Sequence, residues 1–470
     1  MKGSRHDAPH PTIGSANGSP LSRKGRGTKE SLRDSVPMGA SARAAAARAI
    51  DAVLHDGRSL KTVLTESLAD IPDVRDRALV EAICFHTLRH LRRYRYALSQ
   101  WMDKPLPARE HSIEALLLAG LAQLDALALP AHAAVSATAE AARLLRRPAF
   151  VGLVNALLRR ASREPWPVSD NPSIVHSYPD WLAARLRADW PDEWEDLLIA
   201  GNTIAPLWLR VNPRASQRDV YAQQLNAVGI AFESPEWPAH ALRLDQGAAP
   251  DRLPGWSQGA VSVQDAAAQL AAVALAPRDG ERVLDACCAP GGKTAAMLEI
   301  ADSALTAIDS DRQRMTRVDA ALKRLKLSEH ATLQAADAAD LDAWWNGEPF
   351  DAVLLDAPCS ATGIVRRQPD IKWHRRESDL VALLATQDRL LDALWRTLKP
   401  GGRLLYATCS ILRAENAERI AVFLARTPDA AELPLDARYG RVAHPGRQRM
   451  PGEDGMDGFY YALLGKSPAR

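Results

Sequence analysis

Residues 283–294 read VLDACCAPGGKT: a short apolar strand, a turn with two glycines, and the start of a helix. From about residue 264 onward the same pattern is repeated, with short apolar runs separated by helical patterns. Strands are expected at Arg282–Leu284, Leu305–Ile308, Ala352–Leu355, Arg403–Tyr406 and Tyr460–Leu464. Strand–helix alternation of this kind is typical of a parallel, doubly wound sheet. Residues 256–470 are therefore predicted to form a Rossmann-like α/β domain that binds its ligands beyond the carboxyl ends of the strands.

Three further parts precede this domain. Residues 39–163 show Ala- and Leu-rich helical patterns without a strand, so we expect an all-helical bundle with one long helix that begins at Asp73. After a proline-containing linker, residues 173–255 mix helical and strand patterns and are expected to form a small α+β domain. Residues 1–38 hold seven Lys/Arg against three Asp/Glu and predict a disordered basic tail, either a solvated leader or a weak RNA tether.

Composition excludes several classes of protein. The 470 residues are 47% hydrophobic with a net charge of only +2, so any nucleic-acid surface must come from local patches. No apolar run is long enough for a membrane span, and no apolar segment follows the basic N-terminus as in a secretory signal. The odd number of cysteines, without a CxxC pair, predicts neither disulfides nor a metal site and favours the cytoplasm. These cysteines are Cys84, Cys287, Cys288, Cys359 and Cys409.

The glycine turn of 283–294 predicts a cofactor site. Gly291 and Gly292 let a ligand approach the backbone closely, and the following helix N-terminus favours a carboxylate. ATP is disfavoured because Cys287 stands where a Walker A loop needs glycine, and NAD because GxGxxG is absent. S-adenosylmethionine (SAM) is the remaining candidate. Its contacts are expected from Cys287, Cys288, Ala289, Pro290, Gly291, Gly292 and Lys293.

Acidic residues follow the next two strands. Asp309 ends the second strand, about 20 residues past the glycine turn, where a carboxylate suits the two hydroxyls of a ribose. Asp311 is the alternative, although it is better placed to cap the next helix. Asp337 follows the third strand and is expected near the adenine amino group, in preference to the neighbouring Asp340 and Asp342.

Two cysteines follow neighbouring strands, Cys359 in DAPC and Cys409 in ATCS. Their placement at strand ends predicts that both face the cofactor crevice. A thiolate that adds to carbon 6 of a pyrimidine makes carbon 5 nucleophilic enough to take a methyl group from a sulfonium, which is covalent catalysis. Asp356 is expected to contact the cytosine N3 and amino group, and needs a proton if it is to donate to N3. The chemistry alone leaves the two cysteine roles interchangeable.

Basic residues are concentrated in two places. The segment 360–376 combines them with Trp373, a pattern that suits a splayed single strand of RNA, although a solvated loop is the plain alternative. RNA contacts are expected from Arg366, Arg367, Lys372 and Arg375. The helix that begins at Asp73 carries further arginines that either contact an RNA backbone or form a solvated face. They are Arg75, Arg77, Arg89, Arg92, Arg93 and Arg95.

These motifs together resemble the RNA cytosine-5 methyltransferases of the NOL1/NOP2/Sun family. The matching stretches are VLDACCAPGGKT at 283–294, AID at 307–309, LLDAPCSATG at 354–363 and YATCS at 406–410. The resemblance implies that Cys409 is the nucleophile and that Cys359 assists release of the product. It also implies a SAM site formed by 287–293 with Asp309, Asp337 and Asp356. Because DNA cytosine-5 methyltransferases attack from a Pro-Cys motif, the order of the two cysteines rests on the resemblance alone.

The front half also shows a resemblance. FVGLVNALLRR at 150–160 is similar to the RNA-binding fold of the antitermination factor NusB. A NusB-like bundle, a small α+β domain and this catalytic domain in one chain resemble the bacterial branch of the family that acts on the small ribosomal subunit, as do RRQPDIKWHRR at 366–376 and PGEDGMDGFYYALL at 451–464. The resemblance implies cytosine 967 of 16S rRNA as the target, with the RNA free or in an early assembly particle. A monomer without a metal is expected.

Two alternatives remain open. The first is an RNA cytosine-5 methyltransferase that acts on another rRNA site or on tRNA, which the NusB-like domain disfavours. The second is a non-catalytic RNA-binding factor of ribosome assembly. It is disfavoured because Cys359, Cys409, the glycine turn and the three carboxylates are all present.

Overall fold

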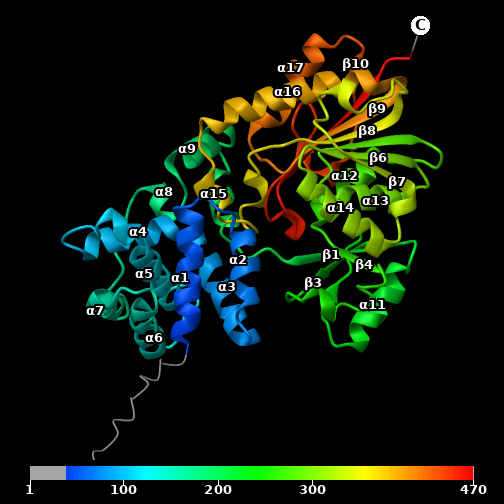
Figure 1. Cartoon of the computed structure of the whole chain (residues 1–470). Coiled ribbons are helices and arrows are strands. Elements are labelled where there is room, and N and C mark those ends of the chain that lie inside the picture. The colour runs from blue at the N-terminus through cyan, green and yellow to red at the C-terminus, as the bar shows by residue number, and fades with distance from the viewer. Residues whose placement is uncertain (1–38, 469–470) are drawn as a thin grey trace, which may run out of the picture. The chain divides into compact units, whose positions relative to one another are not determined.

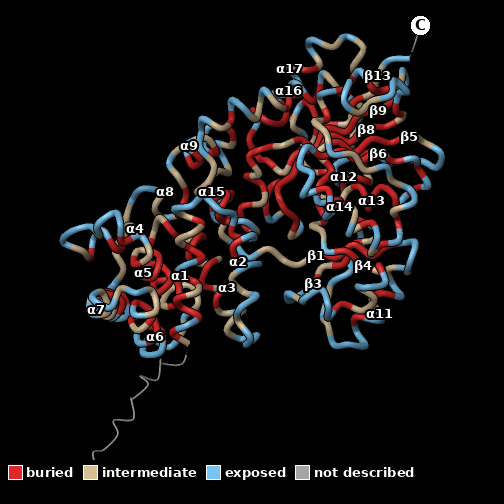
Figure 2. Tube along the Cα trace, in the orientation of Figure 1, coloured by how far each residue is buried: buried red, intermediate tan, exposed pale blue. Residues whose placement is uncertain are grey.

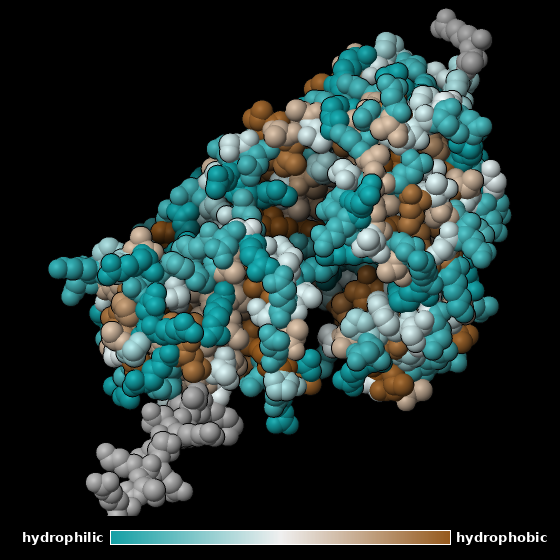
Figure 3. Space-filling model, viewed as in Figure 1, coloured by the Kyte–Doolittle hydropathy of each residue, from teal (hydrophilic) through white to brown (hydrophobic). Residues whose placement is uncertain are grey.

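A computed structural model describes residues 39–468, which belong to one compact unit (Figure 1). The basic tail that we expected at residues 1–38 lies outside the described residues. Figure 2 shows the buried positions concentrated in the helical bundle and along the central strands. The visible face is largely hydrophilic, with apolar residues gathered in a hollow near its centre (Figure 3). Among the described helices, none combines the length and apolarity that a membrane crossing requires.

The first domain is the expected helical bundle. Its helices are α1 (Ala40–Leu54), α2 (Leu60–Ala69), α3 (Val74–Arg89), α4 (Leu91–Trp101), α5 (His111–Leu124), α6 (Ala131–Leu144) and α7 (Val151–Ala161). Helix α5 is buried along most of its length, and α1, α3, α6 and α7 pack around it. The single long helix expected after Asp73 is wrong, because His90 has non-helical dihedral angles and separates α3 from α4. Asp73 does cap α3, since its Oδ1 accepts a hydrogen bond from the Arg75 amide (2.7 Å).

The small second domain contains a four-stranded antiparallel sheet in the order β2-β3-β1-β4. Its elements are α8 (Pro172–Val175), α9 (Asp180–Asp189), α10 (Trp194–Ala200), β1 (Leu207–Val211), α11 (Arg218–Ala227), β2 (Phe232–Glu233), β3 (Ala241–Leu244) and β4 (Val261–Val263). The sequence-based boundary at residue 255 falls too early. Strand β4 pairs with β1, with Leu209 opposite Val263, so the sheet is completed only beyond residue 260.

The C-terminal domain is built on a nine-stranded sheet. Its order is β11-β12-β13-β9-β8-β5-β6-β7, with β10 paired to β13. The strands are β5 (Arg282–Ala286), β6 (Ala304–Asp309), β7 (Ala331–Ala335), β8 (Phe350–Asp356), β9 (Leu398–Thr408), β10 (Ala430–Leu433), β11 (Arg441–Val442), β12 (Arg447–Arg449) and β13 (Phe459–Lys466). Strands β5 to β9 are parallel as predicted, whereas β13 runs antiparallel to β9. The sheet is therefore mixed.

Helices cover both faces of this sheet. They are α12 (Ala266–Leu275), α13 (Gly292–Ile300), α14 (Arg312–Leu325), α16 (Asp379–Thr397) and α17 (Ala417–Arg426). The short helix α15 (Ile371–His374) packs instead against the helical bundle and the helices that follow it. Successive strand residues point to opposite faces, so Val283 packs in the core with α12–α14 and Leu284 in the core with α16 and α17. Apolar residues on both faces explain why the central strands are continuously hydrophobic.

Candidate active site

The strand order reverses between β5 and β8, because the chain proceeds from β5 outward to β7 and then returns to β8. A ligand crevice is expected at such a switch point. The glycine turn leaves β5 there, and the two cysteine loops leave β8 and β9 at the same edge. The residues singled out from the sequence therefore converge on one place in the fold.

The glycine turn is fixed by the strand beside it. The Cys288 amide donates to the Ile308 carbonyl (3.0 Å), and the Ala289 amide donates to Asp309 Oδ2 (3.1 Å). Gly291 caps α13 with a φ of 96°, and a Cβ there would lie 3.1 Å from the Val318 backbone. Both its left-handed conformation and this close packing require glycine. These contacts fix the glycine-containing loop directly before the N-terminus of α13.

The two acidic residues expected to contact the cofactor occupy different environments. Asp309 is buried, and its oxygens accept backbone hydrogen bonds from Ala289 and Asp311 (3.1 and 3.0 Å). Asp337 is half-exposed and accepts a hydrogen bond from Arg389 of α16 (2.8 Å). Partial burial acts to raise the pKa of Asp337, but the hydrogen bonds from Arg389 and the Ala339 amide outweigh it and lower that pKa. Contacts of these residues with ribose and adenine stay predictions.

Asp285 is a site residue that we missed in the sequence. It is fully buried at the end of β5, and its Oδ2 accepts a hydrogen bond from the Thr294 hydroxyl (2.6 Å). Its Oδ1 has no partner among the described residues. Burial raises the pKa of Asp285 to about 7, because the charged form is desolvated beside other carboxylates. Its place directly before the glycine turn was the signal that could have identified it.

Lys293 and Asp356 form an ion pair across the switch point, with Lys293 Nζ 2.7 Å from Asp356 Oδ2. The ammonium also lies 5.1 Å from the centre of the Phe459 ring. Burial acts to lower the pKa of Lys293, but the charge of Asp356 and its hydrogen bond to the ammonium outweigh burial and raise that pKa. The site therefore contains a fixed positive charge, and Asp356 meets it as an acceptor.

The two cysteines lie side by side, with a distance of 3.5 Å between their sulfur atoms. Cys359 is buried, whereas Cys409 is more exposed. Its hydrogen bond with Cys409 and its burial raise the pKa of Cys359 well above the ordinary value. The more accessible Cys409 is therefore better placed than Cys359 to meet a substrate. Within residues 39–468, no group of His, Cys, Asp and Glu side chains could hold a metal ion.

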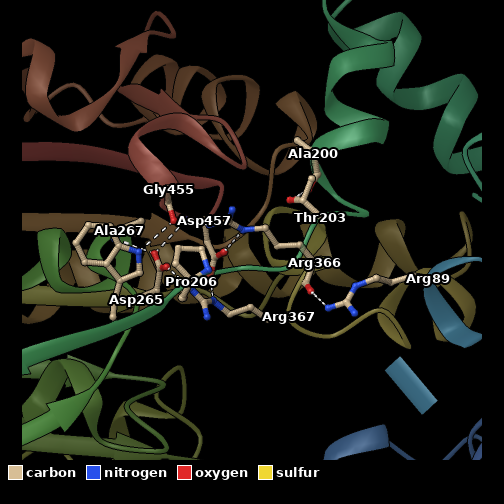
Figure 4. Close-up of polar contacts among 11 residues, drawn as sticks. Arg89, Ala200, Thr203, Pro206, Asp265, Ala267, Arg366, Arg367, Gly455 and Asp457 are labelled. Atoms are coloured by element: carbon tan, nitrogen blue, oxygen red, sulfur yellow. Dashed lines mark hydrogen bonds and ion pairs between the residues drawn. The ribbon is translucent and has the colours of Figure 1, made fainter. Parts of the chain in front are cut away.

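The structure corrects our interpretation of the basic segment 366–376. Arg366 is only 2% exposed and forms an ion pair with Asp457 (2.6 Å). Arg367 lies between Asp457 and Asp265, at 2.5 and 2.6 Å. Figure 4 shows both arginines pointing towards Asp457, with Arg89 reaching the backbone of Arg366. These side chains join parts of the protein, and a buried guanidinium such as that of Arg366 cannot reach an RNA strand.

Lys372 requires the same correction. It is fully buried, and its ammonium donates to the carbonyls of Arg89 and Ser177 (3.0 Å each) and to Asn202 Oδ1 (2.8 Å). Arg375 is partly exposed and donates to the backbone carbonyls of Ser360 (3.2 Å) and Cys359 (3.4 Å). The segment therefore connects the helical domain to the loop that carries Cys359.

The arginines of the helical domain are also largely occupied by protein partners. Arg89 is buried and donates to the Arg366 carbonyl (2.9 Å). Three others form ion pairs, Arg92 with Asp180, Arg93 with Asp125 and Arg95 with Glu114. Arg75 and Arg77 lie on the first turns of α3, where Arg75 is exposed. At least four of these six arginines therefore contact other parts of the protein, so their number alone does not indicate an RNA-binding surface.

Comparison with known proteins agrees with this architecture. Residues 272–465 match the family described as 16S rRNA methyltransferase RsmB/F, residues 178–250 match a ferredoxin-like domain of RsmF/B-like methyltransferases, and residues 40–163 match the NusB family. Ribosomal RNA small subunit methyltransferase B of Xanthomonas campestris pv. campestris is 53% identical over 437 residues, which are 92% of this chain and 99% of the relative.

Two solved structures share the fold. The crystal structure of PH0851 superposes with a TM-score of 0.77 at 24% identity and covers 90% of this chain and 99% of its own. A methyltransferase homolog protein from Pyrococcus horikoshii has a TM-score of 0.56 at 27% identity, with 64% of this chain and 100% of its own covered. The predicted NusB-like bundle and Rossmann-like methyltransferase domain are confirmed.

Replacing Lys372 with methionine is expected to destabilise the protein by about 3 kcal/mol, because three acceptors would lose their donor in a buried place. The urea midpoint of unfolding measures the effect. Lys323→Met is the matched control, since Lys323 is exposed and pairs only with Asp319 on the same helix. Equal midpoints for the two variants would show that Lys372 does not tie the domains together.

Asp285 predicts a specific pH dependence of stability. The folded protein holds this proton up to about pH 7, whereas an unfolded chain releases it near pH 4, so its stabilising contribution is lost as pH rises between these values. At about 1.4 kcal/mol per pKa unit, the loss reaches about 4 kcal/mol. The Tm of Asp285→Asn should therefore fall less than the Tm of the wild type as pH rises from 5 to 8. Asp319→Asn, at an exposed ion pair, is the control, and parallel curves for wild type and Asp285→Asn would refute the assignment.

Proposed function

The chain belongs to the 16S rRNA methyltransferase RsmB/F family, and on that basis we propose that it methylates carbon 5 of a cytosine in 16S rRNA with SAM as the methyl donor. The observation that carries this proposal is the pair of cysteine sulfurs 3.5 Å apart, beside an ion-paired lysine at the switch point of the sheet. Family membership supports rRNA methylation. The chemistry of the site supports the choice of atom.

The residues around the glycine turn fit SAM. Asp285 Oδ1 is a buried acceptor without a partner in the described chain, as suits a site that receives an ammonium group. The first turn of α13 offers unpaired amides to a carboxylate, and Gly291 and Gly292 leave room for close approach. Asp309 and Asp337 would hold the ribose and the adenine. Bound there, SAM supplies a methyl group on a positively charged sulfur.

The cytosine chemistry follows from the two cysteines. Cys409, the more exposed thiol, gives its proton to solvent, and the resulting thiolate forms a bond to carbon 6 of the base, so that electron density moves to carbon 5. Lys293 balances the negative charge that develops on the ring, and Asp356 accepts a hydrogen bond from the cytosine amino group. Carbon 5 then takes the methyl group. Loss of the carbon 5 proton to a base breaks the bond between carbon 6 and sulfur, Cys359 gives its proton to the departing Cys409 sulfur, and Cys359 regains a proton from solvent.

Further details of the proposal concern the substrate. We propose cytosine 967 as the target and RNA that is free or in an early assembly particle as the bound form, recognised by a monomer. The NusB-like domain supports an RNA partner for the N-terminal part. Since Arg366 and Lys372 are buried, base and backbone contacts must come from other residues around the crevice, such as the partly exposed Arg375.

The two cysteine variants should behave differently. Cys409→Ala should reduce methylation by at least about 10³-fold and form no covalent RNA adduct, because it removes the nucleophile. Cys359→Ala should accumulate a protein–RNA adduct when SAM is supplied, which a denaturing gel detects. Cys84→Ala, a buried thiol in the helical bundle, is the control. An adduct formed by Cys409→Ala would reverse the two roles.

The target is tested in cells. Bisulfite sequencing of 16S rRNA from a strain that lacks this gene should show the loss of 5-methylcytosine at position 967. Wild-type protein should restore the modification, and Cys409→Ala should not. Unchanged methylation at 967 in the deletion strain would disprove the target, and a loss at another cytosine would identify the true one.

A further inference from the structure

A buried carboxylate joins the two loops that carry the cysteines. Glu415 lies in a short 3-10 turn, Arg413–Glu415, that follows β9, and it is fully buried. Its Oε1 accepts a hydrogen bond from the Ser360 amide (2.7 Å). Its Oε2 accepts hydrogen bonds from the hydroxyls of Ser360 and Ser410, each at 2.5 Å. Ser360 directly follows Cys359 and Ser410 directly follows Cys409, so one side chain holds both neighbours of the reactive sulfurs.

Other groups extend this junction. Gln387 of α16 donates both to Glu415 (3.3 Å) and to the Pro358 carbonyl, just before Cys359 (3.0 Å). The hydroxyl of Ser410 also lies 3.2 Å from that of Ser360 and 3.1 Å from that of Thr362. The loops are therefore connected by a continuous set of hydrogen bonds with Glu415 at its centre.

Within residues 39–468 the carboxyl group of Glu415 has no ion-pair partner, and its oxygens meet only the hydrogen-bond donors of Ser360, Ser410 and Gln387. Burying a carboxylate without a cation is costly, and the cost is offset only by several strong, charge-assisted hydrogen bonds. A side chain that served only to fill space here could be apolar. The three short hydrogen bonds to Ser360 and Ser410 are what the carboxylate adds.

We propose that Glu415 is a positioning residue that fixes the sulfur atoms of Cys359 and Cys409 at contact distance, so that the proton can pass between them when the product leaves. This inference rests on the proposed function for its catalytic consequence, although the positioning itself can be measured without catalysis. Glu415 is fully buried, so we assign it no contact with RNA or cofactor. Its effect is exerted through the backbone of the two loops.

The kinetic test uses Glu415→Gln in the full-length protein. The variant has the same shape, but its NH₂ group faces donors where the wild type has an acceptor. Loss of loop positioning by about 1 Å should lower kcat by about 10²-fold while KM for RNA and SAM changes less than about threefold. Ser360→Ala and Ser410→Ala remove one arm each and should give intermediate effects. Ser303→Ala, a buried serine on the other side of the domain, is the matched control and should retain full activity.

The second test measures the two thiols directly. Phenylarsine oxide binds two thiols that can reach one arsenic atom, with two As–S bonds formed and one water released. The difference in arsenical affinity between the wild type and Cys359→Ala measures binding to the Cys359–Cys409 pair. Binding to the adjacent Cys287 and Cys288 is common to both proteins and cancels in this difference. Glu415→Gln and the double variant Ser360→Ala/Ser410→Ala should weaken this pair-specific affinity by about tenfold or more, because the effective concentration of the second thiol falls. Ser303→Ala should not.

The outcomes separate the positioning role from the proposed function. If the wild type methylates no cytosine but Glu415→Gln still weakens the arsenical affinity, the proposed function fails and the positioning holds. If kcat falls while the arsenical affinity is unchanged in Glu415→Gln and in the serine variants, the positioning role is refuted. It is refuted as well if Glu415→Gln folds and retains wild-type kcat.

Discussion

The parallel pairing of β8 with β9 sets Asp356 opposite Ala407, so both strands end at the same level of the sheet. The chain leaves β8 towards Cys359 and β9 towards Cys409, and the two sulfurs meet because the strands that carry them are hydrogen-bonded neighbours. On the other side of β8, its pairing with β5 brings the glycine turn and Lys293 up to Asp356. The register of β8 with its two neighbouring strands thus determines which side chains meet at the crevice.

Buried ionisable side chains help to hold the loops and domains in place, and each one meets a different kind of hydrogen-bond or ion-pair partner. Arg366 and Arg367 share Asp457, while Lys372 donates only to neutral acceptors and Glu415 accepts only from neutral donors. Such groups stabilise a fold weakly compared with apolar packing, but leaving any one of them unpaired is costly. They therefore specify one arrangement of the loops and domains against alternatives that would bury the same apolar surface.

The sequence was informative where local patterns decide the outcome. The strands that carry the site, the glycine turn at Gly291 and the convergence of Cys359 with Cys409 could all be predicted, because strand ends in a parallel sheet meet at one edge. The antiparallel direction of β13 could not, since an apolar run looks the same in either direction. Neither could the burial of Arg366 and Lys372, because a cluster of basic residues has the same composition in a solvated loop and in a buried joint. Pairings such as Lys293 with Asp356 depend on strand order, which no local pattern contains.

The joint made by the basic segment has a further consequence for how this sequence can vary. Its side chains Lys372, Trp373 and His374 recognise backbone carbonyls of the preceding domains. Those carbonyls belong to Val53, Leu88, Arg89 and Ser177. Since every residue type carries the same carbonyl group, these four hydrogen bonds do not themselves depend on the side chains at the accepting positions, although the Arg89 guanidinium makes a separate contact with the Arg366 carbonyl. The hydrogen bonds of the joint therefore restrict residue type at the donors Lys372, Trp373 and His374, whereas at Val53, Leu88 and Ser177 the restriction comes from burial and packing rather than from these bonds.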